Sequence, residues 1–524
     1  MNFRDEGRAR SELEHALASG RADAVAESAM MNVWPLFSAH YSLLVAAVES
    51  LPAHVLERYP VLRALHPMTP VLARTNRPFK PLVYPDDARR MSQDELDILT
   101  LTQIVCFRFS GDVAASLIYA RRLSERIQQE GVEARDRVDG PLWYFHHQIA
   151  STYLAAGDSA ASLQALATAR QLARLSKQPD AERLTVGRAA LAYAVRGSLD
   201  DAAAALDEVK EHPRPTPGHQ RSALSTERAA AALVAVERMD ADLDDRLSQL
   251  EPYDSIELAW AFALLARARA RIVQQRPDDA LEAIRLARDA HPPQHGAFAS
   301  DVIAAMSIEA HCANGDLRYA QRIADPSASV GYLTQLASAR LAIQSSRWSL
   351  ASDALRRLLH DRSLSPGARA EALVLSGWME LAHTGTLERP SALQLSRIAR
   401  QGNARRVFAS VPANVARAVS DALNGEDRTS TLMAIGDLPH GDQEVTPTLT
   451  RGELRVLEAL ATHTTTASIA QTFHVSPNTV KSQLRAVYRK LGCSNRGDAI
   501  RIGARLNLLD PDAEHTGRER SPRP

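Results

Sequence analysis

Cationic side chains with helical spacing stand near the end of the chain. Lys481, Arg485 and Arg489 follow one another at intervals of four, and no acidic residue lies between Pro477 and Leu491. Residues four apart share one face of a helix, so these cations lie on the same side. Lysine and arginine can donate hydrogen bonds to guanine edges, and hydroxyl groups can hold phosphates. This face is therefore predicted to contact the DNA major groove.

The segment that must carry these cations has the signals of a complete helix. Ser476 is a suitable N-cap, Pro477 suits the first helical position, and Gly492 can end the helix after Leu491. The side opposite the cations is apolar and is expected to pack on neighbouring helices. Its residues are Val480, Leu484, Val487 and Leu491.

Three further helices are predicted around residues 477–491. Thr450 and Glu453 form a capping-box pattern that opens the first, and the second runs from Ala467 to Phe473. His474 suits a left-handed residue in the tight turn that follows. The last helix, residues 496–506, is capped by Ser494 or Asn495 and turns one apolar side inward.

These residues resemble the LuxR/FixJ-type helix-turn-helix family over about sixty residues without a gap. Departures from the family pattern are Gly452, Ser468 and Gln483, where the family usually has Arg, Glu and His. The matching residues are Leu449-Thr450, Val456-Leu457, Ile469-Ala470, Val475-Ser476, Thr479-Val480-Lys481, Tyr488-Arg489-Lys490-Leu491 and Leu508-Leu509.

The resemblance implies roles for ten residues of this domain. Helix 477–491 would be the recognition helix, with Lys481, Ser482 and Arg485 facing bases. The fourth helix would hold a homodimer together on two half-sites of double-stranded DNA, and RNA polymerase is a candidate partner. Ser476, Thr479 and Arg489 would hold phosphates, and Ala499, Ile502, Gly503 and Leu506 would form the dimer contact.

The long region from Ser11 to about Asn424 is predicted to be helical throughout, so the fold class is all-α. Turn signals recur at roughly 40 residues, which is typical of stacked helix pairs. We interpret the region as a helical-repeat array that resembles tetratricopeptide-like solenoids and binds a small-molecule or protein signal. The turn signals are Gly157-Asp158, Gly197-Ser198, Arg238 to Asp240, Pro277-Asp278 and Gly315-Asp316.

Composition shifts give the expected domain limits. An N-terminal helical segment, 1–88, ends in a proline-rich joint, and the repeat array follows at 89–425. Residues 426–447 are predicted to be a flexible acidic linker that could compete with DNA for the basic helix. Residues 448–510 form the helix-turn-helix domain, and 511–524 a disordered tail.

Charge is unevenly distributed although 62 basic residues balance 62 acidic ones. Residues 449–509 hold nine Lys or Arg and three Asp or Glu, whereas 426–444 hold five acids and one arginine.

Three scattered cysteines predict neither disulfides nor a zinc site. We expect a cytoplasmic protein without a membrane span, cofactor, metal or enzymatic activity.

Three alternatives are weighed against this interpretation. Region 4 of a sigma factor also carries the Ser-x-x-Thr-Val-Lys-Ser pattern, but the chain lacks an upstream polymerase-binding region. An ATP-driven switch is opposed because no lysine follows a glycine, which a P-loop requires. A repeat scaffold could use aromatic side chains to line a ligand groove, although packing in the core explains these residues better. His146-His147 are expected to be ordinary polar residues rather than metal ligands. The aromatic residues are Trp34, Trp143, Tyr144, Trp260, Trp348 and Trp378.

Overall fold

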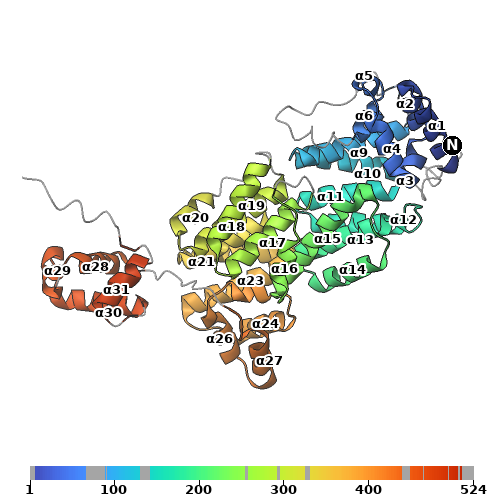
Figure 1. The fold of residues 1–524 in the computed structure, drawn as a ribbon. Coiled ribbons are helices and arrows are strands. Elements are labelled where there is room, and N and C mark those ends of the chain that lie inside the picture. Colours follow the sequence, from blue (N-terminus) through green and yellow to red (C-terminus); the bar gives the residue numbers. More distant parts are fainter. Residues whose placement is uncertain are drawn as a thin grey trace, which may run out of the picture.

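The protein is described here from a computed structural model. It covers residues 6–66, 93–129, 142–253, 258–291, 296–324, 331–439, 449–463, 465–491 and 495–505, with single positions at 89, 91, 493, 508 and 509. Within these ranges it has twenty-nine α-helices and no β-strand, which confirms the all-α class (Figure 1). The predicted tail 511–524, and most of the proline-rich joint, lie outside the described residues.

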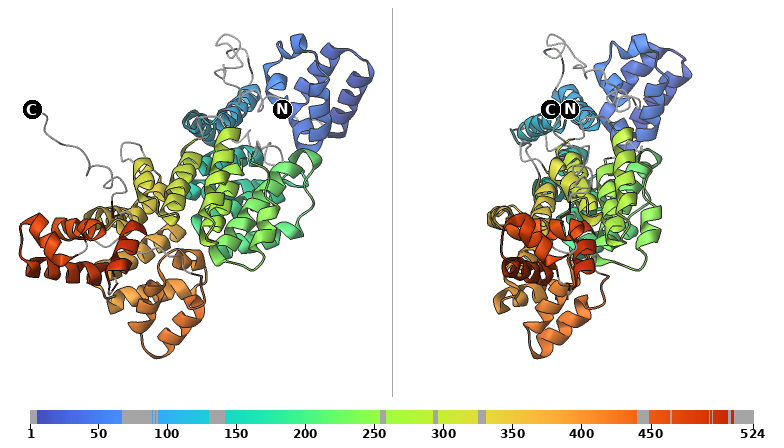
Figure 2. Two further views of the ribbon diagram at one scale, coloured as in Figure 1. Left: turned by 60° about the vertical axis from the view of Figure 1, so that its left-hand side comes forward. Right: turned by 90° about the vertical axis from the view of Figure 1, so that its left-hand side faces the viewer.

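The N-terminal helices lie together at one end of the chain's fold (Figure 2) and have a small hydrophobic core of their own. Leu13, Leu36 and Leu44 are buried there together with Ile98 and Leu99 of α9 (Gln93–Phe109). The predicted domain boundary at residue 88 would separate α9 from this core, whereas α9 packs as part of it. The N-terminal helices are α1 (Glu6–Ala18), α2 (Ala22–Met31), α3 (Val33–Ala39), α4 (Tyr41–Glu49), α5 (Ala53–Leu56) and α6 (Pro60–Leu65).

The next helices are antiparallel pairs whose first members form one continuous inner layer. Each first member contacts the first member of the next pair, and each second member covers the outside. The inner helices are α11 (Leu142–Ala155), α13 (Ala181–Arg196), α15 (Pro217–Arg238), α17 (Trp260–Val273), α19 (Ala297–Ala313), α21 (Tyr332–Gln344) and α23 (Pro366–Thr384). The outer helices are α12 (Ser159–Ala173), α14 (Leu199–Glu211), α16 (Leu243–Ser248), α18 (Pro277–Ala290), α20 (Leu317–Ile323), α22 (Trp348–His360) and α24 (Arg389–Arg400). Helix α10 (Val113–Gln129) pairs with α9 ahead of α11.

The turns within the pairs recur as predicted, and the pairs α9/α10, α21/α22 and α23/α24 are present in addition to those that the sequence signals marked. Gly157, Gly197 and Gly315 adopt left-handed backbone angles at these turns. Met239, Gln275 and Ser346 occupy the same kind of position with φ between 54° and 60°. Side chains at positive φ are uncommon, so the geometry of the pair imposes this turn even without glycine. The pair α21/α22 was missed for that reason, whereas the tetratricopeptide-like repeat type stays a prediction.

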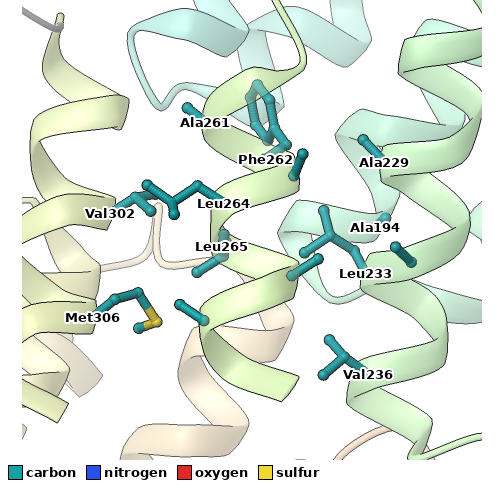
Figure 3. Packing of buried hydrophobic residues seen from close by; sticks show 14 of the residues in the cluster. Ala194, Ala229, Leu233, Val236, Ala261, Phe262, Leu264, Leu265, Val302 and Met306 are labelled. Atoms are coloured by element: carbon teal, nitrogen blue, oxygen red, sulfur yellow. The ribbon is translucent and has the colours of Figure 1, made fainter. Parts of the chain in front are cut away.

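The inner layer packs closely because its contact positions alternate small and large residues. Figure 3 shows Phe262, Leu264 and Leu265 of α17 between Leu233 of α15 and Val302 of α19. All five side chains are buried, and burial of each large apolar side chain contributes roughly 1.5–3 kcal/mol. This hydrophobic layer is what holds the helix pairs together.

The array also closes on itself. Helices far apart in sequence touch at three places, where α11 meets α19, α13 meets α23 and α15 meets the short helix α25 (Arg405–Ala409). At one of them Gly197 is so close that a Cβ atom there would lie 2.5 Å from the Gly367 Cα. A side chain at Gly197 is therefore excluded by space as well as by its positive φ.

Six charged residues, one from each of five successive inner helices and one from the short helix α25, meet where the array closes. We call them the buried charge cluster, and their signs alternate along the chain. Arg406 Nε donates to Glu237 Oε1 at 2.7 Å and its Nη2 to Glu371 Oε2 at 2.8 Å. The cluster joins helices 169 residues apart in sequence. Its members are Glu237 (α15), Arg269 (α17), Glu309 (α19), Arg340 (α21), Glu371 (α23) and Arg406 (α25).

The start of the predicted linker is a docked helix, which corrects the sequence interpretation. Helix α27 (Gly425–Ile435) follows α26 (Ala413–Asp421) and packs on α24 and α25. Asp427 forms an ion pair with Arg400 at 3.0 Å, and Asp437 one with Arg405 at 3.6 Å. These two acids are held by the array, which weakens the idea that the whole acidic segment competes with DNA. Residues 440–447, the rest of the predicted linker, lie outside the described residues.

Candidate nucleic-acid interface

Four helices form a separate bundle at the C-terminal end, drawn in red in Figure 1. Their apolar sides make one small core that includes Leu457 of α28, Ile469 of α29 and Val480 of α30. Each of these three side chains is fully buried. The helices are α28 (Arg451–Thr462), α29 (Thr466–Phe473), α30 (Pro477–Leu491) and α31 (Arg496–Arg505), so the predicted helix 477–491 is confirmed to the residue.

Local hydrogen bonds fix where these helices begin. The Glu453 amide donates to Thr450 Oγ1 at 3.3 Å, and the Thr450 amide donates to Glu453 Oε2 at 2.6 Å, which is the predicted capping box. Asn495 Oδ1 accepts from the Asp498 amide at 2.9 Å, so Asn495 caps α31. Cap interactions of this kind contribute about 1 kcal/mol each. They set the start of each helix independently of the rest of the chain.

The turn before α30 has the geometry of a helix-turn-helix. His474 lies in the left-handed region with φ 54°, as predicted, and ends α29. Ser476 Oγ accepts from the Thr479 amide at 3.1 Å and so caps α30. Ser476 and Thr479 are exposed at the N-terminal end of this helix. Free amides and the helix dipole at such an end favour a phosphate.

The outer face of α30 carries positive charge into solvent. Lys481, Ser482 and Arg485 are all exposed, whereas Val480 and Leu484 on the opposite side are buried. The predicted base-facing residues therefore share one open surface. Arg489 belongs to α30, but its side chain is outside the described set.

The residues predicted to form the dimer contact lie mainly inside the domain, which differs from the expectation. Ala499 is fully buried, Ile502 packs against the core, and a Cβ atom on Gly503 would lie 3.1 Å from a methyl group of Leu457. The apolar side of an amphipathic helix first covers its own core, and α31 follows that rule. Leu506 lies outside the described residues.

Two departures from the family pattern are neighbours in space, which sequence alone did not reveal. A Cβ atom on Gly452 would lie 2.7 Å from Gln483 Nε2. Gln483 of α30 therefore occupies the space that a side chain at position 452 of α28 would need. Helical spacing could have indicated this, because Gln483 lies between the exposed face and the buried stripe.

The other residues singled out from the sequence are mostly structural. Trp143 and Trp378 are fully buried, Trp260 and Trp348 pack at the edges of cores, and the Trp34 side chain is outside the described set. His147 is buried, and its ring stacks on Tyr144. In the part of the chain that is described, no three His, Cys, Asp or Glu side chains are grouped as a metal would need.

This arrangement defines a helix-turn-helix DNA-binding domain. Residues 447–502 match the family of bacterial regulatory proteins, luxR family, so the C-terminal domain is a LuxR-family helix-turn-helix domain. The family recognition made from the sequence is thereby confirmed for this part of the chain.

Two relatives support the same assignment. Both are described as probable transcriptional regulatory protein NarL, from two strains of Mycobacterium tuberculosis, CDC 1551 / Oshkosh and ATCC 25618 / H37Rv. Each is 31% identical over 104 residues, which is 19% of this chain and 48% of the relative. The chain thus spans about half the length of the curated relatives it matches. No helix in the described ranges has both the length and the apolarity to cross a bilayer.

Proposed function

We propose that the chain is a sequence-specific transcriptional regulator that inserts α30 into the DNA major groove. The observation that carries the proposal is the exposed face of α30, where Lys481, Ser482 and Arg485 stand together opposite a buried apolar stripe. Arginine and lysine can pair with guanine edges from this position, and Ser476 and Thr479 can hold the adjacent phosphates. Arg489 is proposed as a further phosphate contact from the same helix.

We also propose that the protein acts in the cytoplasm as a dimer on two half-sites. Because Ala499 and Gly503 are used for internal packing, the dimer contact is assigned to the outward face of α31, which carries exposed Arg501. A ligand or protein bound to the repeats would then shift the protein between states with different DNA affinity. RNA polymerase is the expected partner once DNA is bound.

The sigma-factor alternative has less support than this proposal. Asn495 caps a fourth helix that packs on α28 and α30, and this helix belongs to the luxR pattern. The alternative that the repeats are mainly a ligand-binding scaffold also has less support. It expects an open groove, whereas the inner layer closes on itself around the buried charge cluster.

Selection of bound fragments from random DNA by the full-length protein tests the proposal. We expect wild type to enrich a site with two related halves, and a Lys481→Ala, Arg485→Ala double variant to lose it. The matched control is Lys210→Ala with Arg285→Ala, which removes two exposed charges from the array instead.

Retention of the enriched site by the Lys481 and Arg485 variant would contradict the recognition-helix assignment. Equal loss in the control variant would mean that net charge, and not the face of α30, determines binding. Both variants are also measured at several salt concentrations. A variant that has lost contacts to phosphates shows a weaker dependence of DNA affinity on salt concentration than wild type, so the salt dependence tells whether a variant has lost charge contacts to the DNA backbone.

A further inference from the structure

A cleft of about 550 Å³ opens on the array between α16, α17 and α18. Three arginines line it: Arg267 and Arg271 of α17, and Arg276, which precedes α18. Two carboxylates, Asp244 and Asp279, share the wall. Its volume is within the usual range for small-molecule sites.

Arg267 is held rigidly at this cleft. Its Nη2 donates to the backbone carbonyls of Leu250 at 3.1 Å and Glu251 at 2.9 Å. The guanidinium also lies over the Tyr253 ring, 4.7 Å from its centroid. The Tyr253 carbonyl is 2.8 Å from His291 Nε2, and the His291 ring stacks on Trp260. These contacts place the guanidinium before any ligand arrives, which lowers the entropy cost of binding.

The same guanidinium has no acidic partner in the part of the chain that is described. Both of its hydrogen bonds come from Nη2, and Nε and Nη1 make none with the described residues. Burial lowers the pKa of Arg267 from its usual value, and the neighbouring Arg271 charge lowers it further. A half-buried cation without a counter-charge is unfavourable, and an anion in the cleft would remove that penalty.

The other two arginines already have partners in the cleft wall. Arg271 Nη1 donates to Gln274 Oε1 at 2.7 Å and lies 3.5 Å from Asp244 Oδ1, a carboxylate whose side chain is 73% exposed. Arg276 pairs with Asp279, and its own side chain is 57% exposed. Among the described residues that line the cleft, three cations face two acids, which leaves a net positive charge for an anion.

We propose that this cleft binds a small anionic metabolite through a phosphate or carboxylate group. Guanidinium groups grip both kinds of group with paired hydrogen bonds, and Tyr253 and Leu247 provide apolar contact beside them. The proposal gives a ligand class to the regulatory role suggested above for the repeats. Only the regulatory effect of anion binding depends on the proposed function, because the binding itself requires no DNA.

Calorimetric titration of the full-length protein without DNA tests the inference. The probes are sodium pyrophosphate and sodium malonate, each at an ionic strength fixed with sodium chloride. We expect saturable binding of at least one probe, weakened roughly tenfold or more by Arg271→Gln with Arg276→Gln. Arg285→Gln is the matched control, since Arg285 is an exposed α18 arginine that does not line the cleft.

Each outcome of the titration either supports or overturns anion binding by the cleft. Binding of pyrophosphate alone identifies a phosphate ligand, and binding of malonate alone a carboxylate ligand. The inference is overturned if neither probe binds saturably, or if the double variant binds as tightly as wild type. A failed DNA selection with intact anion binding would instead count against the proposed function alone.

Discussion

Thr450 and Glu453 each satisfy a backbone amide at the start of α28, and both groups lie within four residues of sequence. The same is true of Ser476 at α30 and Asn495 at α31. Such pairs are visible in the sequence because every atom that takes part belongs to one turn of helix. The burial of Ala499 was not visible, because it depends on which neighbour α31 packs against.

At this scale we predict that Thr450→Ala lowers the stability of the C-terminal domain by about 1 kcal/mol, since one amide at the start of α28 loses its acceptor. Hydrogen exchange of the α28 amides measures the change. Thr472→Ala is the control, because Thr472 is an exposed threonine of the same domain whose hydroxyl bonds back to the Ser468 carbonyl within α29. Equal exchange in wild type and Thr450→Ala would contradict the role of the cap.

At the scale of elements, α27 shows where composition misleads. Its first turn is acidic and its sequence is polar, so the sequence predicts a linker, yet Thr431 and Ile435 are buried. Thr431 Oγ1 lies 2.8 Å from Ser396 Oγ of α24 within the interior. Acidic residues near the start of a helix are favoured by its dipole, which is compatible with Glu426 and Asp427 at this place.

Ile435→Ala is expected to destabilise this part of the array by about 2–5 kcal/mol, because it removes a large apolar side chain from a packed site. Leu432→Ala is the matched control on the same helix, where the side chain is 45% exposed. Hydrogen exchange of residues 425–435 reports the difference. Rapid exchange of this segment in wild type would mean that α27 is not docked.

At the scale of the whole molecule, the buried charge cluster fixes how the array closes. Glu371 Oε1 accepts from Arg340 Nη2 at 3.2 Å, and Glu371 Oε2 accepts from Arg406 Nη2. Side chains of both arginines are at most 3% exposed. Removing one charge from such a group leaves others buried without compensation, and that is costly.

We therefore predict that Glu371→Gln lowers the free energy of unfolding by about 3–5 kcal/mol. Glu282→Gln, which breaks a solvent-exposed ion pair with Arg285, should have a much smaller effect. Denaturant unfolding of the two variants compares them directly. Similar small losses for both would show that the cluster contributes little to closure.

The same carboxylate predicts a dependence on pH. Burial alone would raise the pKa of Glu371, but the charges of Arg406, Arg340 and Arg269 outweigh it and lower the pKa to about 2. The ionised Glu371 carboxylate contributes fully to stability at pH values above the usual glutamate pKa. This contribution is lost as the pH falls toward the lowered pKa of Glu371. The stability difference between wild type and Glu371→Gln should therefore narrow as pH decreases from about 5 to about 3. A difference that stays constant over this interval would contradict the lowered pKa.

The sequence by itself determined the all-α class, the helix-turn-helix domain with its helix 477–491, and most of the turns within the helix pairs. These features arise from caps, left-handed turns and a 3.6-residue apolar period, which are encoded within one or two helical turns. Only the tertiary structure decided that α27 is docked, that Ala499 serves the core, and that Glu237 meets Arg406. Such contacts join segments up to 169 residues apart. They depend on the curvature that successive helix pairs accumulate, and no local pattern in the sequence specifies it.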